Sequence, residues 1–95
     1  MYYAVIFTST RTETEEGYAE MAEKMENLAK QQPGFIGVES ARNEIGITVS
    51  YWESLEAIKS WKMNFDHLDA QQKGRSSWYK NYKVRIAKVE REYEF

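Results

Sequence analysis

The stretch YWESLEAIKSW, residues 51–61, joins a strand to a helix and fixes the order of the elements around it. Before the junction, residues 47–52 alternate in two phases, one with Ile47, Val49 and Tyr51 and the other with Thr48, Ser50 and Trp52. After the junction, Ser54 is a suitable N-cap, and apolar residues follow a 3.6-residue period at Leu55, Ile58, Trp61, Phe65 and Leu68. The stretch therefore predicts a strand followed by an amphipathic helix, which runs to Gly74 and could break near Asn64.

Three further elements are predicted on the N-terminal side of this junction. Residues 35–40 read as a strand after Pro33-Gly34, and turn residues 43–46 join it to residues 47–52 as a hairpin. Residues 2–7, YYAVIF, predict a strand that is apolar on both faces. Between these strands, Thr12 stands three residues before Glu15 at capping-box spacing. The helix predicted there carries its apolar face at Tyr18, Met21, Ala22, Met25, Leu28 and Ala29.

The tail, from about Tyr79 to Phe95, alternates again and predicts a long last strand. The order β-α-β-β-α-β indicates an α+β protein with the ferredoxin-like split βαβ arrangement, in which an antiparallel sheet carries both helices on one face. We expect a single domain over residues 1–95. Because the other face of the sheet would be hydrophobic, we also expect a homodimer, with the chain itself as a partner.

Composition narrows the possible functions. The 95 residues include no cysteine, which excludes disulfides, thiol nucleophiles and thiolate metal sites. A net charge of −2 gives no field that would gather nucleic acid, and no apolar run reaches the roughly 20 residues of a membrane span. We expect a cytoplasmic protein without nucleic-acid or membrane partners. His67 is the only histidine, and with Asp66 and Asp69 it makes a weak metal site, so no metal is expected.

The aromatic residues suggest a pocket. Trp52, Trp61, His67 and Trp78 fall within 27 consecutive residues. Trp61 can serve as core or as pocket wall, whereas Trp52 is expected to pack beneath the second predicted helix. Trp78 and Tyr79 suggest either a lid or dimer contact or a loop anchored by its own ring.

Six basic residues and no acidic one lie between Lys73 and Lys88. Lysines on an edge strand that block aggregation explain most of this run. A surface for phosphate binding and base stacking, and an anionic small ligand met by Arg75 or Arg85, are the other two readings.

Several features occur together in an order that resembles the antibiotic biosynthesis monooxygenase family. They are Pro33-Gly34-Phe35 at the start of the second strand, the Trp-x-Ser-x-Glu-Ala turn of residues 52–57, and the stretch from Trp61 to His67. Residues 74–79 and 84–91 look typical of one branch of uncharacterised bacterial members. The resemblance implies a dimeric α+β barrel with a pocket between sheet and helices. It also implies either oxygenation without metal or flavin, or binding and degradation of heme.

On this resemblance we expect a cofactor-independent monooxygenase that acts on a small aromatic or quinol substrate. The expected pocket residues are Trp61, Phe65, Phe7 and Tyr51, with Arg75 and Arg85 as further ligand contacts and His67 as candidate base. A non-catalytic dimeric ligand-binding or stress-response module is the alternative.

Heme degradation is a second alternative, and the sequence disfavours it. Heme-degrading members place the iron-ligating histidine ten residues after the tryptophan, where this chain has Gln71. The asparagine that those members carry on the first strand is absent from Val5-Ile6-Phe7. His67, at a shifted position, is still open as a heme ligand. We expect no cofactor, and heme is the disfavoured alternative.

Overall fold

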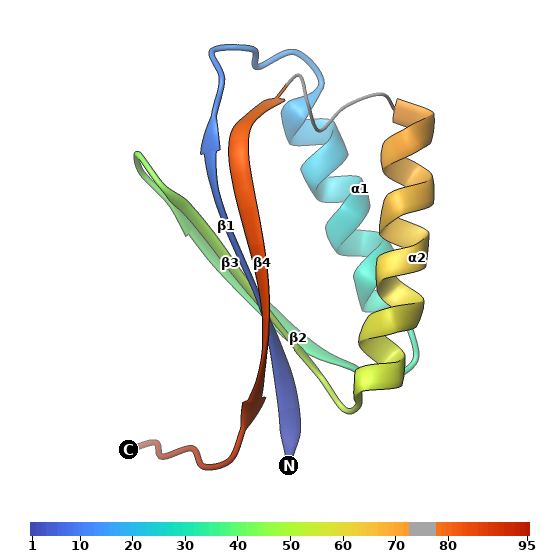
Figure 1. Cartoon of the computed structure of the whole chain (residues 1–95), viewed down its shortest axis with the longest axis vertical. Coiled ribbons are helices and arrows are strands. Elements are labelled where there is room, and N and C mark those ends of the chain that lie inside the picture. Colours follow the sequence, from blue (N-terminus) through green and yellow to red (C-terminus); the bar gives the residue numbers. More distant parts are fainter. Residues whose placement is uncertain (73–77) are drawn as a thin grey trace.

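The computed structural model describes residues 1–72 and 78–95, with the backbone alone for residues 67–72. The elements are β1 (Tyr2–Arg11), α1 (Tyr18–Lys30), β2 (Phe35–Arg42), β3 (Gly46–Trp52), α2 (Leu55–Gln72) and β4 (Tyr79–Val89). The predicted β-α-β-β-α-β order is confirmed. The four strands form one antiparallel sheet in the order β2-β3-β1-β4, and both helices lie on one side of it (Figure 1). None of the helices in the described ranges is long and apolar enough to cross a membrane.

Strand β1 is central in the sheet and is apolar on both faces. The strand pairs with β3 on one side and with β4 on the other, so that Val5 lies between Ser50 and Ile86. Its odd-numbered residues face the helices and its even-numbered residues face away, up to an irregularity between Thr10 and Arg11. The helices cover the odd-numbered face, and the even-numbered apolar residues belong to the face of the sheet that carries no helix.

The start of α1 differs from the expectation. The helix begins at Tyr18, after Gly17 in a left-handed conformation with φ of 79°, and not near Thr12 and Glu15. The Thr12 hydroxyl accepts a hydrogen bond from the backbone N–H of Thr14 at 3.2 Å. The predicted capping box is therefore wrong, because this hydroxyl organises a local turn that competes with a helix start.

Helix α2 follows the sequence closely at its start. The Ser54 hydroxyl accepts the N–H of Ala57 at 3.1 Å, which confirms the predicted N-cap. The helix is continuous from Leu55 to Gln72, so the expected break near Asn64 is absent. The Asn64 amide donates to the Ser60 carbonyl and to the Gln32 side chain, each at 3.2 Å, and these bonds accommodate a polar residue within the helix. Strand β4 ends at Val89, and residues 90–95 follow without regular structure.

The core is centred on Trp52, which is fully buried at the end of β3. Its ring stacks on Trp61 of α2, with centroids 6.0 Å apart and planes at 21°, and meets Phe35 edge-on at 5.3 Å. Its indole N–H donates to the Ser50 hydroxyl at 2.9 Å, so the polar atom of the ring is satisfied. Buried Ile58 completes the contact between α2 and the sheet. Packing of Trp52 beneath the second helix is thus confirmed.

Gly34 brings the start of β2 against the start of α2. Its φ is 86°, and its carbonyl accepts the N–H of Glu53 at 2.8 Å. A side chain here would place its Cβ 2.7 Å from the Cβ of Ala57, which is closer than real Cβ atoms approach. Glycine is required at this position both by the backbone conformation and by the close approach.

We predict that Trp52→Ala lowers the free energy of unfolding by about 3–5 kcal/mol, because it removes a fully buried ring and leaves a cavity between β3 and α2. Met63→Ala, on an exposed position of α2, is the control and is expected to change stability by about 0.5 kcal/mol or less. Urea unfolding followed by circular dichroism measures both. A Trp52→Ala loss below about 1 kcal/mol would contradict the assigned core.

Candidate functional site

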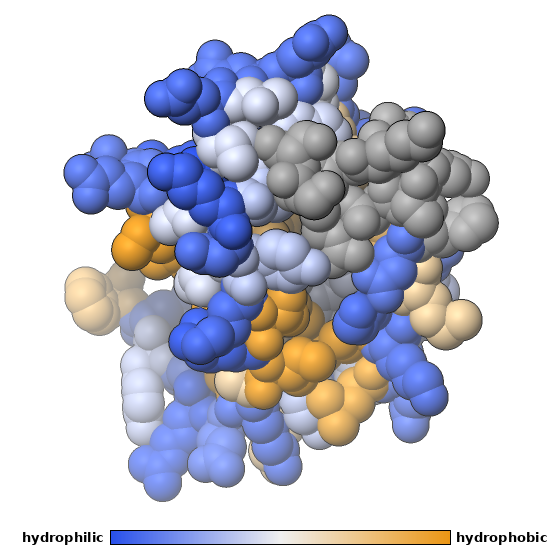
Figure 2. Space-filling view, turned by 45° about the horizontal axis from the view of Figure 1, so that its top comes forward, coloured by the Kyte–Doolittle hydropathy of each residue, from blue (hydrophilic) through white to orange (hydrophobic). Residues whose placement is uncertain are grey.

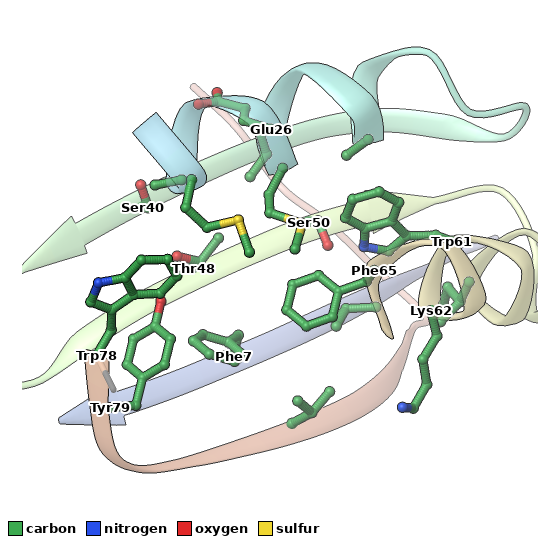
Figure 3. A pocket seen from close by; sticks show the side chains of 18 of the residues that line it. Phe7, Glu26, Ser40, Thr48, Ser50, Trp61, Lys62, Phe65, Trp78 and Tyr79 are labelled. Carbon is green, nitrogen blue, oxygen red and sulfur yellow. The ribbon is translucent and has the colours of Figure 1, made fainter. Parts of the chain in front are cut away.

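A cavity of about 300 Å³ lies between the sheet and the two helices. The helix-facing residues of all four strands form its floor. Side chains of α1 and α2, most of them apolar but including Glu26 and Lys62, form its roof (Figure 3). The lining is mostly aromatic and aliphatic, with three hydroxyl residues on the floor, which are Ser40, Thr48 and Ser50. A mostly apolar cavity with a few polar groups is typical of a site for a small organic molecule.

The cavity is least covered over β4. Helix α1 packs against β2 and α2 packs against β3, while the helix-facing Val84 and Ile86 of β4 stay 45% and 51% exposed. In the space-filling view, hydrophobic residues gather at the centre of the face shown, with hydrophilic residues around them (Figure 2). The cavity-facing side of β4 is therefore partly open to solvent.

Aromatic rings close both ends of the cavity (Figure 3). Trp61 and Phe65 stand at one end, with ring centroids 5.9 Å apart. Trp78 and Tyr79 stand at the other end, and Phe7 lies between, 5.5 Å from Tyr79. The Trp78 ring is 8% exposed.

Trp78 anchors the segment that follows the undescribed residues. Its indole N–H donates to the Glu16 carbonyl at 2.9 Å, and its ring packs on Met21 and edge-on against Tyr18. The structure therefore agrees with a loop anchored by the ring of Trp78, which was one of the two interpretations of the sequence; the other was a lid or dimer contact.

Phe7, Trp61 and Phe65 line the cavity, in keeping with their predicted placement between sheet and helices. Their contact with a substrate stays a prediction. Tyr51 and Arg85 are not among the residues that line it, so the expected placement of Tyr51 in this pocket is wrong, and the ligand contact expected of Arg85 stays a prediction. Each follows or precedes helix-facing residues by one position, so strand alternation turns its side chain to the opposite face of the sheet.

On that opposite face Tyr51 has partners of its own. Its hydroxyl donates to the Glu39 carboxylate at 2.6 Å, and its ring meets Tyr2 edge-on at 5.9 Å. The hydrogen bond to the carboxylate, with a smaller contribution from burial, raises the pKa of Tyr51 to about 12. This phenol is therefore neutral at any physiological pH.

Two predicted site residues fall outside the description. Arg75 lies among residues 73–77, and His67 belongs to the part of α2 for which the backbone alone is described. The role of each stays a prediction. Across residues 1–66 and 78–95, no group of three His, Cys, Asp or Glu side chains is placed to hold a metal ion.

Sequence reasoning missed a pair of phenols at the Trp78 end of the cavity. The Tyr79 hydroxyl donates to the Tyr18 hydroxyl at 3.5 Å. Burial, and then this hydrogen bond, raise the pKa of Tyr79 well above its ordinary value. The guanidinium of Arg11 lies 3.4 Å from the ring centroid of Tyr18.

The two phenols differ in how visible they were in the sequence. Tyr18 shares the helical face of Met21 and Met25, so the period could have found it. Tyr79 is odd-numbered, whereas the other cavity-facing residues of β4 are even-numbered. It faces the cavity because the register of β1 with β4 shifts between Thr10 and Arg11, and no sequence signal marks that shift.

Comparisons with known proteins agree with the observed architecture. A model of the antibiotic biosynthesis monooxygenase family matches residues 1–73. The uncharacterised protein YqjZ of Bacillus subtilis (strain 168) is 55% identical over 93 residues, which cover 96% of this chain and 82% of that protein.

Two solved structures share the fold at low sequence identity. SnoaB, a cofactor-independent oxygenase from Streptomyces nogalater, superposes with a TM-score of 0.78 at 10% identity, covering 96% of this chain and 95% of that one. Rv0793 from Mycobacterium tuberculosis superposes with a TM-score of 0.81 at 10% identity, covering 99% and 100%.

We predict that the phenol of Tyr51 titrates near pH 12 in the native protein and closer to its ordinary value of 10 in Glu39→Gln, which removes the charged acceptor. Since the folded pKa is raised, the stability from this hydrogen bond is fully present below pH 10 and is lost as pH rises through about 12. Absorbance at 295 nm, read as the difference from Tyr51→Phe, measures the midpoint. Equal midpoints with and without the Glu39 carboxylate would contradict the assigned contact.

Proposed function

The chain belongs to the antibiotic biosynthesis monooxygenase family, and on that premise we propose that it is a cofactor-independent monooxygenase acting on a small aromatic or quinol substrate. The observation that carries the proposal is the apolar cavity closed at both ends by aromatic rings, Trp61 and Phe65 at one end and Trp78 and Tyr79 at the other. The SnoaB fold supports the oxygenase class as an analogy of fold.

The proposed chemistry asks little of the protein beyond binding and one proton transfer. A base removes a proton from the substrate, and the resulting electron-rich anion reduces dioxygen directly. For an anthrone-type substrate, one oxygen atom replaces two hydrogens at the reacting carbon to form a carbonyl, and the other oxygen leaves as water. His67 is our candidate base, since its unperturbed pKa lies near neutrality.

The walls of the cavity suit this reaction. Trp61, Phe65 and Phe7 offer flat surfaces for a planar ring system. The apolar walls also reduce contact of the anion with bulk water, which would protonate it before it meets dioxygen. The hydroxyls of Thr48 and Ser50 can supply hydrogen bonds at the floor.

We further propose that the active form is a homodimer in which the open faces of two sheets meet. This face carries Ile6, Ile47, Val49 and Tyr51, of which Ile47 is 46% exposed. A second copy offers the same apolar patch, and two-fold packing of like surfaces is the commonest closed assembly. The cytoplasmic location expected from the composition also stays part of this proposal.

Oxygen uptake with anthrone and with a naphthoquinol, without added metal or cofactor, tests the activity. We predict uptake above the uncatalysed rate, a loss of tenfold or more in Thr48→Phe, which fills the cavity floor, and a lowered kcat in His67→Ala. Thr14→Phe, in the exposed loop between β1 and α1, adds the same ring outside the cavity and is the control.

Each other outcome selects a different function. Specific ligand binding without oxygen uptake would favour the non-catalytic binding module. A saturable one-to-one Soret band with hemin that decays after ascorbate would favour heme degradation. Uptake that is equal in Thr48→Phe and the wild type would show that the reaction does not use this cavity.

For the dimer, we predict that Val49→Glu shifts the protein to a monomer, because two carboxylates would be buried against each other at the centre of the open face. Sedimentation velocity measures the shift, with Glu44→Ala in the exposed turn before β3 as the control. A wild type that sediments as a monomer at micromolar concentration would contradict the proposal.

A further inference from the structure

The Trp78 end of the cavity is chemically unlike the rest of it. Tyr18 comes from the first turn of α1 and Tyr79 from the start of β4, and both line the cavity with their hydroxyls 3.5 Å apart. At that separation, near the upper limit for a hydrogen bond, the two phenols hold each other weakly. A better placed oxygen could replace this contact at little cost.

One hydroxyl hydrogen of the pair is not used in the bond between the two phenols. Each phenol can donate one hydrogen bond and accept others. Tyr79 donates to Tyr18, and within the described residues the Tyr18 hydroxyl contacts no hydrogen-bond partner except Tyr79. Because burial raises the pKa of Tyr79, this group stays protonated and acts as a donor at physiological pH.

Two arginines place positive charge near the phenols. The Arg11 guanidinium covers the ring of Tyr18 at 3.4 Å and is fixed by a hydrogen bond from Nη2 to the Thr14 carbonyl at 2.8 Å. The charges of Arg42 and Arg11 also act on Tyr79 in the direction that favours a negative partner. An oxygen with partial or full negative charge is thus favoured at this end.

We propose that Tyr18 and Tyr79 form a hydrogen-bonding subsite that holds a carbonyl or phenolic oxygen of a planar aromatic ligand at the Trp78 end of the cavity. The remaining rings of the ligand would lie toward Phe7 and Phe65. The inference rests on the proposed function only in taking this cavity as the ligand site, and it requires no turnover. The phenols act in it as donors that orient the ligand, while proton removal is left to another group.

The test compares two ligands of similar size that differ in one group, 1-naphthol and 1-methylnaphthalene, by equilibrium dialysis. We expect Tyr79→Phe and Tyr18→Phe to weaken naphthol binding by about three- to tenfold, the effect of losing one net hydrogen bond. Binding of methylnaphthalene should stay within about twofold, which also shows that the cavity is intact. The double variant should lose less than the product of the two single losses, because the pair acts as a unit.

Tyr82→Phe is the matched control. This tyrosine lies on the same strand, and its ring stacks on Phe7 at 5.4 Å, yet it is not among the residues that line the cavity. Equal losses for both ligands, no loss for naphthol, or a wild type that binds neither ligand would each overturn the subsite. A selective loss of naphthol binding in the variants, in a protein that consumes no oxygen, would support the subsite and reject the oxygenase. Oxygen uptake without that selective loss would support the oxygenase and reject the subsite.

Discussion

The contact of Trp52 with Trp61 is the interaction on which the rest of the structure depends. One indole ends β3, the other lies two turns into α2, and their stacking places the helix over the sheet. Ser54 caps the helix between them, so the strand, the turn and the helix are fixed by residues close in sequence. Because Trp61 also lines the cavity, the same contact that builds the core sets the position of one cavity wall.

Strand alternation then divides the molecule into two surfaces with different uses. The helix-facing side of β3 carries Thr48, Ser50 and Trp52, and the other side carries Ile47 and Val49. The more polar set therefore faces the cavity, where hydroxyls can meet a ligand, and the more apolar set faces outward, where a second copy can cover it. A one-residue shift in register would exchange the two sets and remove both properties.

Most of the fold could be predicted from the sequence, but only part of the site could. Hydrophobic period placed every strand and helix in order, because each element is long enough to repeat its pattern several times. The site depends on single positions, where one step of alternation decides the face, and Tyr51 was assigned to the pocket although Trp52 beside it was assigned beneath the helix. These two assignments exclude each other in one regular strand.

Other parts of the site depend on irregularities that carry no pattern. Tyr79 reaches the cavity only because the register between β1 and β4 shifts. Thr12 carried a capping signal that its own turn uses instead. Such local competition is settled by tertiary packing, which no count along a single chain contains.

The most direct test of the account is an NMR titration of the three indole N–H resonances with 1-naphthol, combined with intermolecular NOEs. We predict that the resonances of Trp61 and Trp78 shift, while that of Trp52, which is buried and bonded to Ser50, moves least. We also predict NOEs between ligand protons and the Phe7 ring. Ligand NOEs to Val49 on the open face, with the Trp61 and Trp78 resonances unmoved, would contradict the assignment of the cavity as the ligand site.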